Sequence, residues 1–286
     1  ALGCATQTTF VIANPNAPTL GIAANPAAIC AGNSVTLTPT GAVSYTITNP
    51  VQSFTTNVIL TPSTTTVYDI TGTDASSCTS APLTVTVNVN ALPTISVTST
   101  SAAICAGNTA TLTANTTGTT TVDNYNWNTG ATVNTITVSP TAQTVYTVAG
   151  TNTLTGCVSA VQSITVNVNT TPTVAVASQT NVLCFGNTNG AVDITTSATT
   201  LSITPATTSL TVGSYTFTIT DLATTCTNTV AATIAGPTVA LTAVVNNTTT
   251  NTSCATPNGA FTVTALGGTP NYTYNATNTT GIFVNQ

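Results

Sequence analysis

The chain of 286 residues has no Lys, Arg, His, Glu or Met, and its only acidic side chains are five aspartates. General acid–base catalysis normally uses His, Glu, Asp or Lys with a tuned pKa, and a nucleophilic Ser, Thr or Cys needs an adjacent base. Aspartate is the only such base in this sequence, so we expect no catalytic residues and no enzymatic activity. The five acidic residues are Asp69, Asp74, Asp123, Asp193 and Asp221.

The absence of cations also limits the partners of the chain. Only 2% of its residues are charged, against about 25% in a typical soluble domain. Without Lys or Arg nothing can pair with phosphate groups, so counterion release cannot drive binding to nucleic acid. No run of about 18 apolar residues is present, which argues against membrane insertion as a helix. Because charged side chains are so few, the uncharged polar side chains of Thr, Asn and Ser must keep the surface hydrated.

Internal repetition is marked by four Pro-Thr pairs, each of which opens an alternating segment and precedes a cysteine. The pairs are 75, 79 and 65 residues apart, so each unit is small and its core alone is marginally stable. The pairs begin at Pro18, Pro93, Pro172 and Pro237, and the cysteines that follow them are Cys30, Cys105, Cys184 and Cys254.

The first two units match closely, because the motif AICAGN at residues 28–33 recurs at residues 103–108. Later in each unit, strands alternate between Val, Ile or Tyr and polar residues, which is the period of half-buried β-strands. No window has helical periodicity. The sequence therefore predicts an all-β fold of tandem Ig-like antiparallel β-sandwich modules, each with one disulfide, arranged as an elongated rod.

The repeats divide the chain into five segments. Residues 1–17 are expected to be the last strand of a preceding module, or of a module in a neighbouring subunit, because Gly3-Cys4 resembles Gly156-Cys157. Residues 18–91 and 92–171 are each predicted to be one Ig-like module. Residues 172–236 are predicted to be a variant module, and residues 237–286 an incomplete copy of that variant.

Six of the eight cysteines distribute as one early and one late residue per module. An even number of cysteines in a chain that is not expected to be cytosolic supports disulfide formation. We expect the pairs Cys30–Cys78, Cys105–Cys157 and Cys184–Cys226. Each bond would close a loop of roughly 40 to 50 residues and stabilise its module by about 4 kcal/mol in the chain-entropy model. Free thiols are the alternative. A zinc site is not expected, since the chain has no His and no CxxC motif.

Two cysteines, Cys4 and Cys254, are left over as inter-module or inter-subunit cysteines. The chain could be a part of a longer tandem array, which also fits the missing initiator Met and signal peptide. Alternatively, it could be a polymerising subunit whose N-terminal strand completes the incomplete module of its neighbour by donor-strand exchange. We favour the first interpretation, because incomplete modules at both ends are what an arbitrary cut produces.

These motifs carry a family resemblance over nearly the whole chain. The first two modules, with CAGN, TVYTV and GC motifs, resemble the Ig-like or PKD-like repeats of large secreted surface proteins of Bacteroidetes-type bacteria. Residues 172–236 and 237–286, with CFGNTNGAVDI, GSYTFTITD and GGTPNYTY, resemble the SprB-type repeats of gliding-motility adhesins from the same group. The resemblance implies export by the type IX secretion route and a role in adhesion, gliding or fibre formation.

Two further features have a structural and a functional interpretation. Asp74 and Asp221 precede the late cysteines, where they could bind calcium, but an Asx turn explains them better because Asn152 stands at the same place. Aromatic residues at repeated positions could stack on sugars, but core packing explains them better. The expected core aromatics are Tyr45, Tyr68, Tyr125, Trp127, Tyr146 and Tyr215.

These observations predict a secreted, extracellular, non-catalytic repeat protein that forms part of an adhesive fibre or stalk at the cell surface. A surface without Lys or Arg gives trypsin-like proteases no cleavage site, so we expect protease resistance. No cofactor is expected, and the partners are neighbouring modules or subunits, with surface glycans as a further possibility. A carbohydrate-binding module array and a polymerising fibre subunit are the alternative functions.

Overall fold

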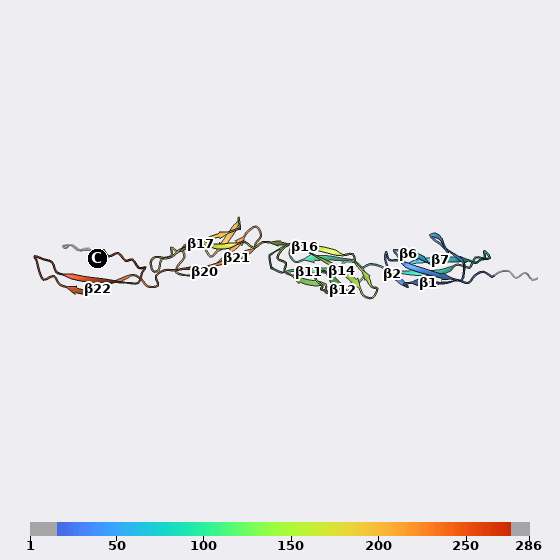
Figure 1. The fold of residues 1–286 in the computed structure, drawn as a ribbon, viewed down its shortest axis with the longest axis horizontal. Coiled ribbons are helices and arrows are strands. Elements are labelled where there is room, and N and C mark those ends of the chain that lie inside the picture. Colours follow the sequence, from blue (N-terminus) through green and yellow to red (C-terminus); the bar gives the residue numbers. More distant parts are fainter. Residues whose placement is uncertain (1–15, 276–286) are drawn as a thin grey trace, which may run out of the picture. The chain divides into compact units, whose positions relative to one another are not determined.

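The structure is a computed structural model, and it describes residues 16–275. Within these residues every regular element is a β-strand, from β1 to β23 (Figure 1). The described residues accordingly contain no helix that could span a membrane. The prediction of an all-β fold built from tandem Ig-like sandwiches is confirmed.

By its internal contacts the chain divides into two compact units. One unit consists of Ala1–Ala102, Thr109–Val138 and Gln143–Val166, and the other of Ala103–Asn108, Ser139–Ala142 and Asn167–Gln286. The first unit contains β1 to β9 together with most of the strands up to β16. The second contains β10 and the strands from β17 onward.

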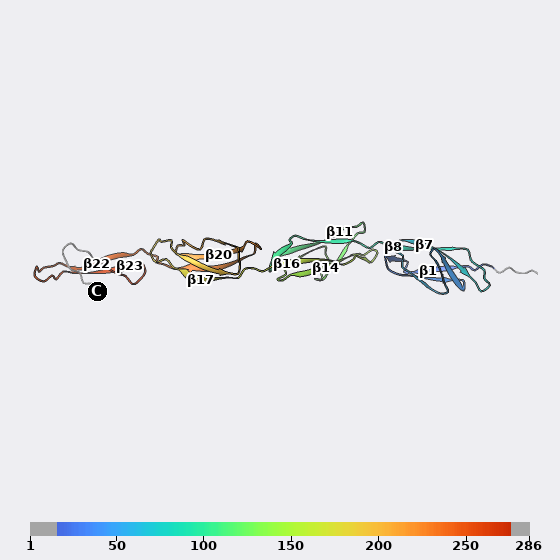
Figure 2. The same ribbon diagram turned by 90° about the horizontal axis from the view of Figure 1, so that it is seen from above.

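The first repeat is a sandwich of two sheets, with strand orders β1-β3-β6 and β2-β8-β7-β4-β5 (Figure 2). In β7 the side chains of Tyr68 and Ile70 are buried while Asp69 is exposed, as the two-residue period of a strand requires. Leu37, Ile47 and Val87 complete the centre of the core. The strands are β1 Gly21–Asn25, β2 Ala28–Cys30, β3 Val35–Thr40, β4 Ser44–Thr48, β5 Val51–Phe54, β6 Val58–Leu60, β7 Thr66–Thr73 and β8 Leu83–Asn90.

The second repeat has the same architecture, with sheets β13-β11-β9 and β10-β16-β14-β12, and β15 pairs with β14. Its core places Leu112, Trp127, Val148 and Val166 where the first repeat has Leu37, Ile47, Ile70 and Val87. The strands are β9 Ile95–Ser99, β10 Ala103–Cys105, β11 Ala110–Thr116, β12 Asn124–Trp127, β13 Thr135–Val138, β14 Thr144–Asn152, β15 Cys157–Val158 and β16 Gln162–Asn169.

One detail differs from the expected antiparallel pairing. In each of these two repeats the chain changes sheets after its first strand, so that β2 pairs in parallel with β8, and β10 with β16. Pro26 has no amide hydrogen to donate, which helps to end β1 before β2 begins. The short second strand therefore runs beside the last strand of its own repeat and ends level with it.

The third repeat packs the two-stranded sheet β17-β18 against the three-stranded sheet β19-β20-β21. Phe217, Ile219 and Ile234 are fully buried between them. The fourth repeat contributes one antiparallel pair, β22-β23. The strands are β17 Val174–Thr180, β18 Ala191–Thr196, β19 Leu201–Thr204, β20 Gly213–Asp221, β21 Thr227–Ile234, β22 Thr242–Thr249 and β23 Ala260–Leu266.

Candidate functional site: disulfide joints between repeats

The early cysteine of each of the first three repeats opens the same tight turn, with the sequence Cys-x-Gly-Asn. The amide of Asn33 donates to the carbonyl of Cys30 at 2.9 Å, and the corresponding turns begin at Cys105 and Cys184. Gly32 has a φ of +85° in this turn, a conformation that favours glycine at the third turn position. The turn fixes where the early cysteine lies relative to the sheet.

This position is the end of the repeat from which the chain leaves toward the next one. In β2 the residue Cys30 is level with Asn90, the last residue of β8. In β10 the residue Cys105 is likewise level with Asn169, the last residue of β16. The early cysteine therefore lies beside the linker that leads into the following repeat.

The late cysteine occupies the opposite end of its repeat. It lies after β7 or β14, and these strands run antiparallel to β8 and β16. Ile70 in the second half of β7 is level with Leu83 at the start of β8, so the loop with Cys78, which follows β7, lies far from Asn90. In the second repeat, Cys157 follows β14 in the same way.

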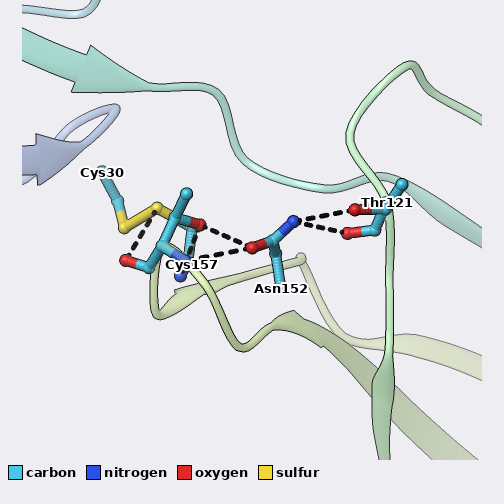
Figure 3. The surroundings of a disulfide bond; sticks show 5 residues. Cys30, Thr121, Asn152 and Cys157 are labelled. Carbon is cyan, nitrogen blue, oxygen red and sulfur yellow. Dashed lines mark hydrogen bonds between the residues drawn. A yellow bond between two sulfur atoms is a disulfide. The ribbon is translucent and has the colours of Figure 1, made fainter.

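The two disulfides of the described residues join an early cysteine to the late cysteine of the following repeat. Cys30 is bonded to Cys157, 127 residues away, and their Cα atoms are 5.6 Å apart (Figure 3). Cys105 is bonded to Cys226, 121 residues away, with the same Cα separation. Each bond lies within one compact unit.

The predicted pairing within each module, Cys30–Cys78, Cys105–Cys157 and Cys184–Cys226, is therefore wrong. A disulfide requires Cα atoms within about 7 Å of each other. The eight residues of β8 alone separate the two ends of the first sandwich by about 25 Å. Early and late cysteines of one repeat cannot meet across that length, whereas the two ends that face a linker can.

The remaining cysteines have the following positions. Cys184 and Cys254 are exposed and form no disulfide among residues 16–275. Cys78 is half-buried at the late position of the first repeat. Cys4 lies outside the described residues, as does the predicted strand of residues 1–17 over most of its length.

A polar network holds the loop that carries Cys157 (Figure 3). The side-chain amide of Asn152 donates to the carbonyl oxygen and to Oγ1 of Thr121, both at 3.0 Å. Its Oδ1 accepts from the amide of Thr155 at 3.0 Å. Asn152 is only 6% exposed, and Cys157 is fully buried. These hydrogen bonds constrain the loop in addition to the disulfide.

Asp123 adds a second anchor to the same loop. Its Oδ2 accepts from the hydroxyl of Thr153 at 2.7 Å, and its Oδ1 accepts from the amide of Thr153 at 2.9 Å. These two hydrogen bonds, the one from the hydroxyl above all, lower the pKa of the Asp123 carboxyl below its usual value. The ionised carboxylate is therefore the form that holds the loop.

The aspartates before the other late cysteines cap turns of the predicted kind. Oδ1 of Asp74 accepts from the amides of Ser76 and Cys78, at 2.8 and 2.9 Å. Oδ1 of Asp221 accepts from the amide of Ala223 at 2.9 Å. These bonds define Asx turns. Among the described residues, no three acidic, Cys or His side chains are grouped as a metal site would require.

Five of the six predicted core aromatics are buried, and Tyr215 is half-buried. The single Trp is 2% exposed and donates from Nε1 to the carbonyl of Val133 at 2.9 Å. The hydroxyl of Tyr45 bonds to the backbone of Ala42. These rings are therefore not exposed as a platform for stacking on sugars. The five buried aromatics are Tyr45, Tyr68, Tyr125, Trp127 and Tyr146.

No family model matches the sequence, and no curated protein does. Solved structures with a similar arrangement include fibronectin(III)-like modules of Clostridium thermocellum CbhA, at 14% identity over 53% of this chain and 95% of that one, with a TM-score of 0.30. The eight N-terminal Ig domains of Down Syndrome Cell Adhesion Molecule are similar at 11% identity, over 78% of this chain and 42% of that one, with a TM-score of 0.33.

Three N-terminal domains of the outer capsid protein Hoc of bacteriophage RB49 are similar at 15% identity, over 76% of this chain and 80% of that one, with a TM-score of 0.26. At such scores the likeness adds no argument of its own. The assignment to an Ig-like fold follows from the strand order and sheet pairing of this chain.

Proposed function

We propose that the chain is a load-bearing, non-catalytic segment of an extracellular repeat protein that forms a fibre or stalk at the cell surface. The observation that carries the proposal is the pair of disulfides, Cys30–Cys157 and Cys105–Cys226, each of which joins one repeat to the next. Because each bond connects two repeats, it does not cross-link the hydrophobic core of a single repeat. They add a second covalent connection beside the backbone linker.

This second connection changes how far the chain can be stretched. From Cys30 to Cys226 the backbone runs through 196 residues, the difference between the two positions, or about 670 Å when fully extended. Because the two disulfides overlap in sequence, three backbone segments connect the same two bonds, and the shortest is the 52 residues between Cys105 and Cys157, or about 180 Å. A pulling force is then carried by that short segment, and the rest of the chain between Cys30 and Cys226 cannot be fully extended.

The same bonds support an extracellular location, because structural disulfides persist in oxidising environments and are rare in the cytosol. A chain without Lys or Arg offers no site to trypsin-like proteases. Disulfides also limit the local opening on which other proteases depend. Durability under load and proteolysis is a property that a surface fibre needs.

The sequence motifs support a more specific setting. The Ig-like and SprB-type patterns resemble repeats of Bacteroidetes-type surface adhesins, so we place the parent protein among substrates of type IX secretion with a role in adhesion or gliding. A carbohydrate-binding array is less well supported, because the aromatics proposed for sugar stacking are buried. The proposed partners are neighbouring repeats or subunits.

Single-molecule force spectroscopy tests the proposal. The chain is held by tags at its two ends and stretched with and without a reductant. We expect about 490 Å of additional contour length from the segment 30–226 only after reduction, as the difference between the two path lengths. The double variant Cys157→Ser/Cys226→Ser should release this length without reductant, whereas Cys254→Ser should not change it. Cys157→Ser alone should release only about 80 Å, because Cys105–Cys226 still connects the chain and leaves a path of 75 residues.

Full extension of the segment 30–226 in the oxidised wild type would overturn the proposal. So would a saturable effect of glycans on the force trace at low load, because a stalk needs no ligand. Both measurements use the whole chain in its oxidised state.

A further inference from the structure

The loops that carry the two bonded late cysteines have the same length and the same backbone course. They consist of residues 152–157 and 221–226, and each ends at its cysteine. In each loop the amide of the residue before the cysteine donates to the carbonyl of the first loop residue, at 2.8 Å from Gly156 and at 2.7 Å from Thr225. The two loops can therefore be compared position by position.

Opening of these loops controls access to the two disulfides. Cys157 and Cys226 are fully buried, and their partners Cys30 and Cys105 are half-buried. Reduction begins with the attack of a thiolate on one sulfur atom of the bond. Because no cysteine of either bond is exposed, the rate of reduction follows the fraction of molecules in which the loop is open.

The Cys157 loop is anchored to a distant part of its own repeat (Figure 3). The side-chain amide of Asn152 donates two hydrogen bonds to Thr121, and Thr153 donates two to the carboxylate of Asp123. These partners are 31 and 30 residues apart in the sequence. Opening of the loop therefore breaks four hydrogen bonds to another segment.

The Cys226 loop has a carboxylate where the Cys157 loop has an amide. Asp221 cannot donate a hydrogen bond, and its oxygens accept from neighbours in the loop itself, at 2.9 and 3.1 Å. Within residues 16–275, no side chain of this loop forms a long-range hydrogen bond like those of Asn152. One backbone bond, from the amide of Leu222 to the carbonyl of Thr200 at 2.9 Å, connects the loop to a neighbouring segment. The Cys226 loop therefore breaks fewer long-range hydrogen bonds when it opens.

The Cys226 loop also contains a strained residue. Thr225, directly before the cysteine, has a φ of +62°, a left-handed conformation that is unfavourable for a β-branched side chain. The same position in the other loop is Gly156, which adopts a φ of +72° without strain. Because the side chain of Thr225 is exposed, packing does little to offset its strain. Opening of the Cys226 loop relaxes this residue.

We propose that the Cys105–Cys226 bond is a redox-sensitive switch, which a dithiol reduces before it reduces the permanent joint Cys30–Cys157. In the reaction, one thiolate of the dithiol attacks a sulfur atom of the bond and expels the other cysteine as a thiolate. The second thiol of the reductant then resolves the mixed disulfide. Two hydrogens pass to Cys105 and Cys226, and the dithiol is oxidised to a disulfide. The proposal rests on the load-bearing function argued above and adds its regulation.

Selective reduction releases the chain in two unequal steps. With both bonds present, the shortest connection from Cys30 to Cys226 runs through the 52 residues between Cys105 and Cys157. Opening Cys105–Cys226 alone replaces it with the 69 residues between Cys157 and Cys226, a gain of about 60 Å. Opening the second bond adds 127 residues, the difference between 196 and 69, or about 430 Å. The switch therefore lengthens the chain slightly before full extension is possible.

The test follows the reduction of both bonds in the same molecules. Free thiols of the oxidised chain are blocked, dithiothreitol is added at limiting concentration, and newly formed thiols are trapped over time with an isotope-labelled alkylating reagent. Peptide mass spectrometry then measures the label at each cysteine. We expect label at Cys105 and Cys226 to appear at least tenfold faster than label at Cys30 and Cys157. Equal rates, or the reverse order, would overturn the proposal.

A reciprocal pair of variants tests the strain. Thr225→Gly removes it from one loop, and Gly156→Thr introduces it into the other, where a Cβ atom would meet no atom within 4 Å. We expect the first to slow the labelling of Cys226 at least threefold and the second to accelerate the labelling of Cys157 by a similar factor. In each variant the unaltered bond is the internal control for folding. An unchanged rate at either altered loop would overturn the role assigned to strain.

Thr153→Val tests the anchors of the Cys157 loop. It removes the hydroxyl that donates to Asp123 at 2.7 Å and keeps the shape of an exposed side chain. We expect Cys157 to be labelled at least threefold faster and Cys226 at the wild-type rate. An equal change at both cysteines would contradict the anchoring role, because it would report a general loss of stability.

Failure of the switch is distinguishable from failure of the load-bearing function. Equal rates of reduction leave the extension limit of the oxidised chain unchanged, and the force experiment measures that limit without reductant. At limiting dithiothreitol, the same experiment should show a step of about 60 Å before a step of about 430 Å. Reduction of Cys30–Cys157 first would instead give about 80 Å and then about 410 Å, and would overturn the switch.

Discussion

Cys30 and Cys157 lie in different repeats, 127 residues apart in sequence, and their Cα atoms are 5.6 Å apart in the disulfide that joins them. In the chain-entropy model, closing a loop of this length stabilises the folded state by about 5 kcal/mol. That is close to the value for the shorter loops expected within single modules. The two pairing schemes therefore differ less in stability than in what they connect, because the observed disulfide links two repeats and a disulfide within a module would not.

Cleavage at aspartate distinguishes the two pairing schemes, and the five aspartates fall between the relevant cysteines. In a variant with Cys4, Cys184 and Cys254 changed to Ser, cleavage before each Asp under non-reducing conditions should leave fragment 1–68 bonded to fragment 123–192. Fragment 74–122 should be bonded to fragment 221–286. The measurement is the intact mass of the linked pairs before and after reduction. A bond between fragments 1–68 and 74–122 would restore the pairing within modules and contradict the observed joints.

The difference between what could and could not be predicted lies in these cysteines. The alternation of Tyr68, Asp69 and Ile70 is a local property, so the strand and its buried face follow from sequence alone. Disulfide pairing depends on which end of the sandwich each residue occupies, and Cys30 reaches its end only because β2 pairs in parallel with the last strand. Nothing local in AICAGN specifies that pairing.

A partial signal was nevertheless present in the sequence. Cys78 lies between the two long strands that end the repeat, and a loop joining antiparallel neighbours must lie opposite the end of the last strand. Cys78 could therefore have been placed away from the following linker. The position of the early cysteine could not be predicted, because it depends on the change of sheets between the first and second strands of the repeat.

Asn152 should be important for the stability of the second repeat. Changing Asn152 to Ala removes the acceptor for Thr155 and both bonds to Thr121, in a side chain that is 6% exposed. We expect the free energy of unfolding to fall by about 1 to 3 kcal/mol, measured by denaturant titration of the oxidised chain. Asn152→Asp keeps the acceptor and loses the donor, so its loss should be smaller. The exposed Asn126→Ala on β12 is the control, and a loss equal to that of Asn152→Ala would contradict the prediction.

The hydroxyl of Tyr45, near the start of β4, should contribute in the same way in the first repeat. The hydroxyl of Tyr45 accepts from the amide of Ala42 at 3.0 Å and donates to its carbonyl at 2.8 Å, in a ring that is 4% exposed. Tyr45→Phe leaves both backbone groups without this partner, and we expect a loss of about 1 to 2 kcal/mol in the free energy of unfolding. Tyr68→Phe removes a hydroxyl of similar burial for which the described residues show no such bond to the backbone. Denaturant titration should find it less costly, and the reverse order would refute this account.

The pH dependence of stability should be concentrated at low pH. The chain has no His or Glu, so few groups titrate between about pH 5 and 7, and the free energy of unfolding should be flat in that range. The pKa of Asp123 is lowered in the folded state by its hydrogen bonds from Thr153. A carboxyl of this kind binds a proton more readily when unfolded, so its stabilising contribution is present above the unfolded pKa, near 3.9, and is lost as the pH falls through the lower folded pKa.

Asp123→Asn removes this titrating group and keeps one acceptor for Thr153. Thermal unfolding of the variant and the wild type at pH 2 to 7 should give melting temperatures that converge as the pH falls, with the wild type higher at pH 7. If the difference between them stays constant with pH, then the carboxylate does not hold the Cys157 loop through its charge. Since the same loop carries half of the joint between repeats, acid should also make Cys30–Cys157 more accessible to reductant, and Asp123→Asn should reduce that pH dependence.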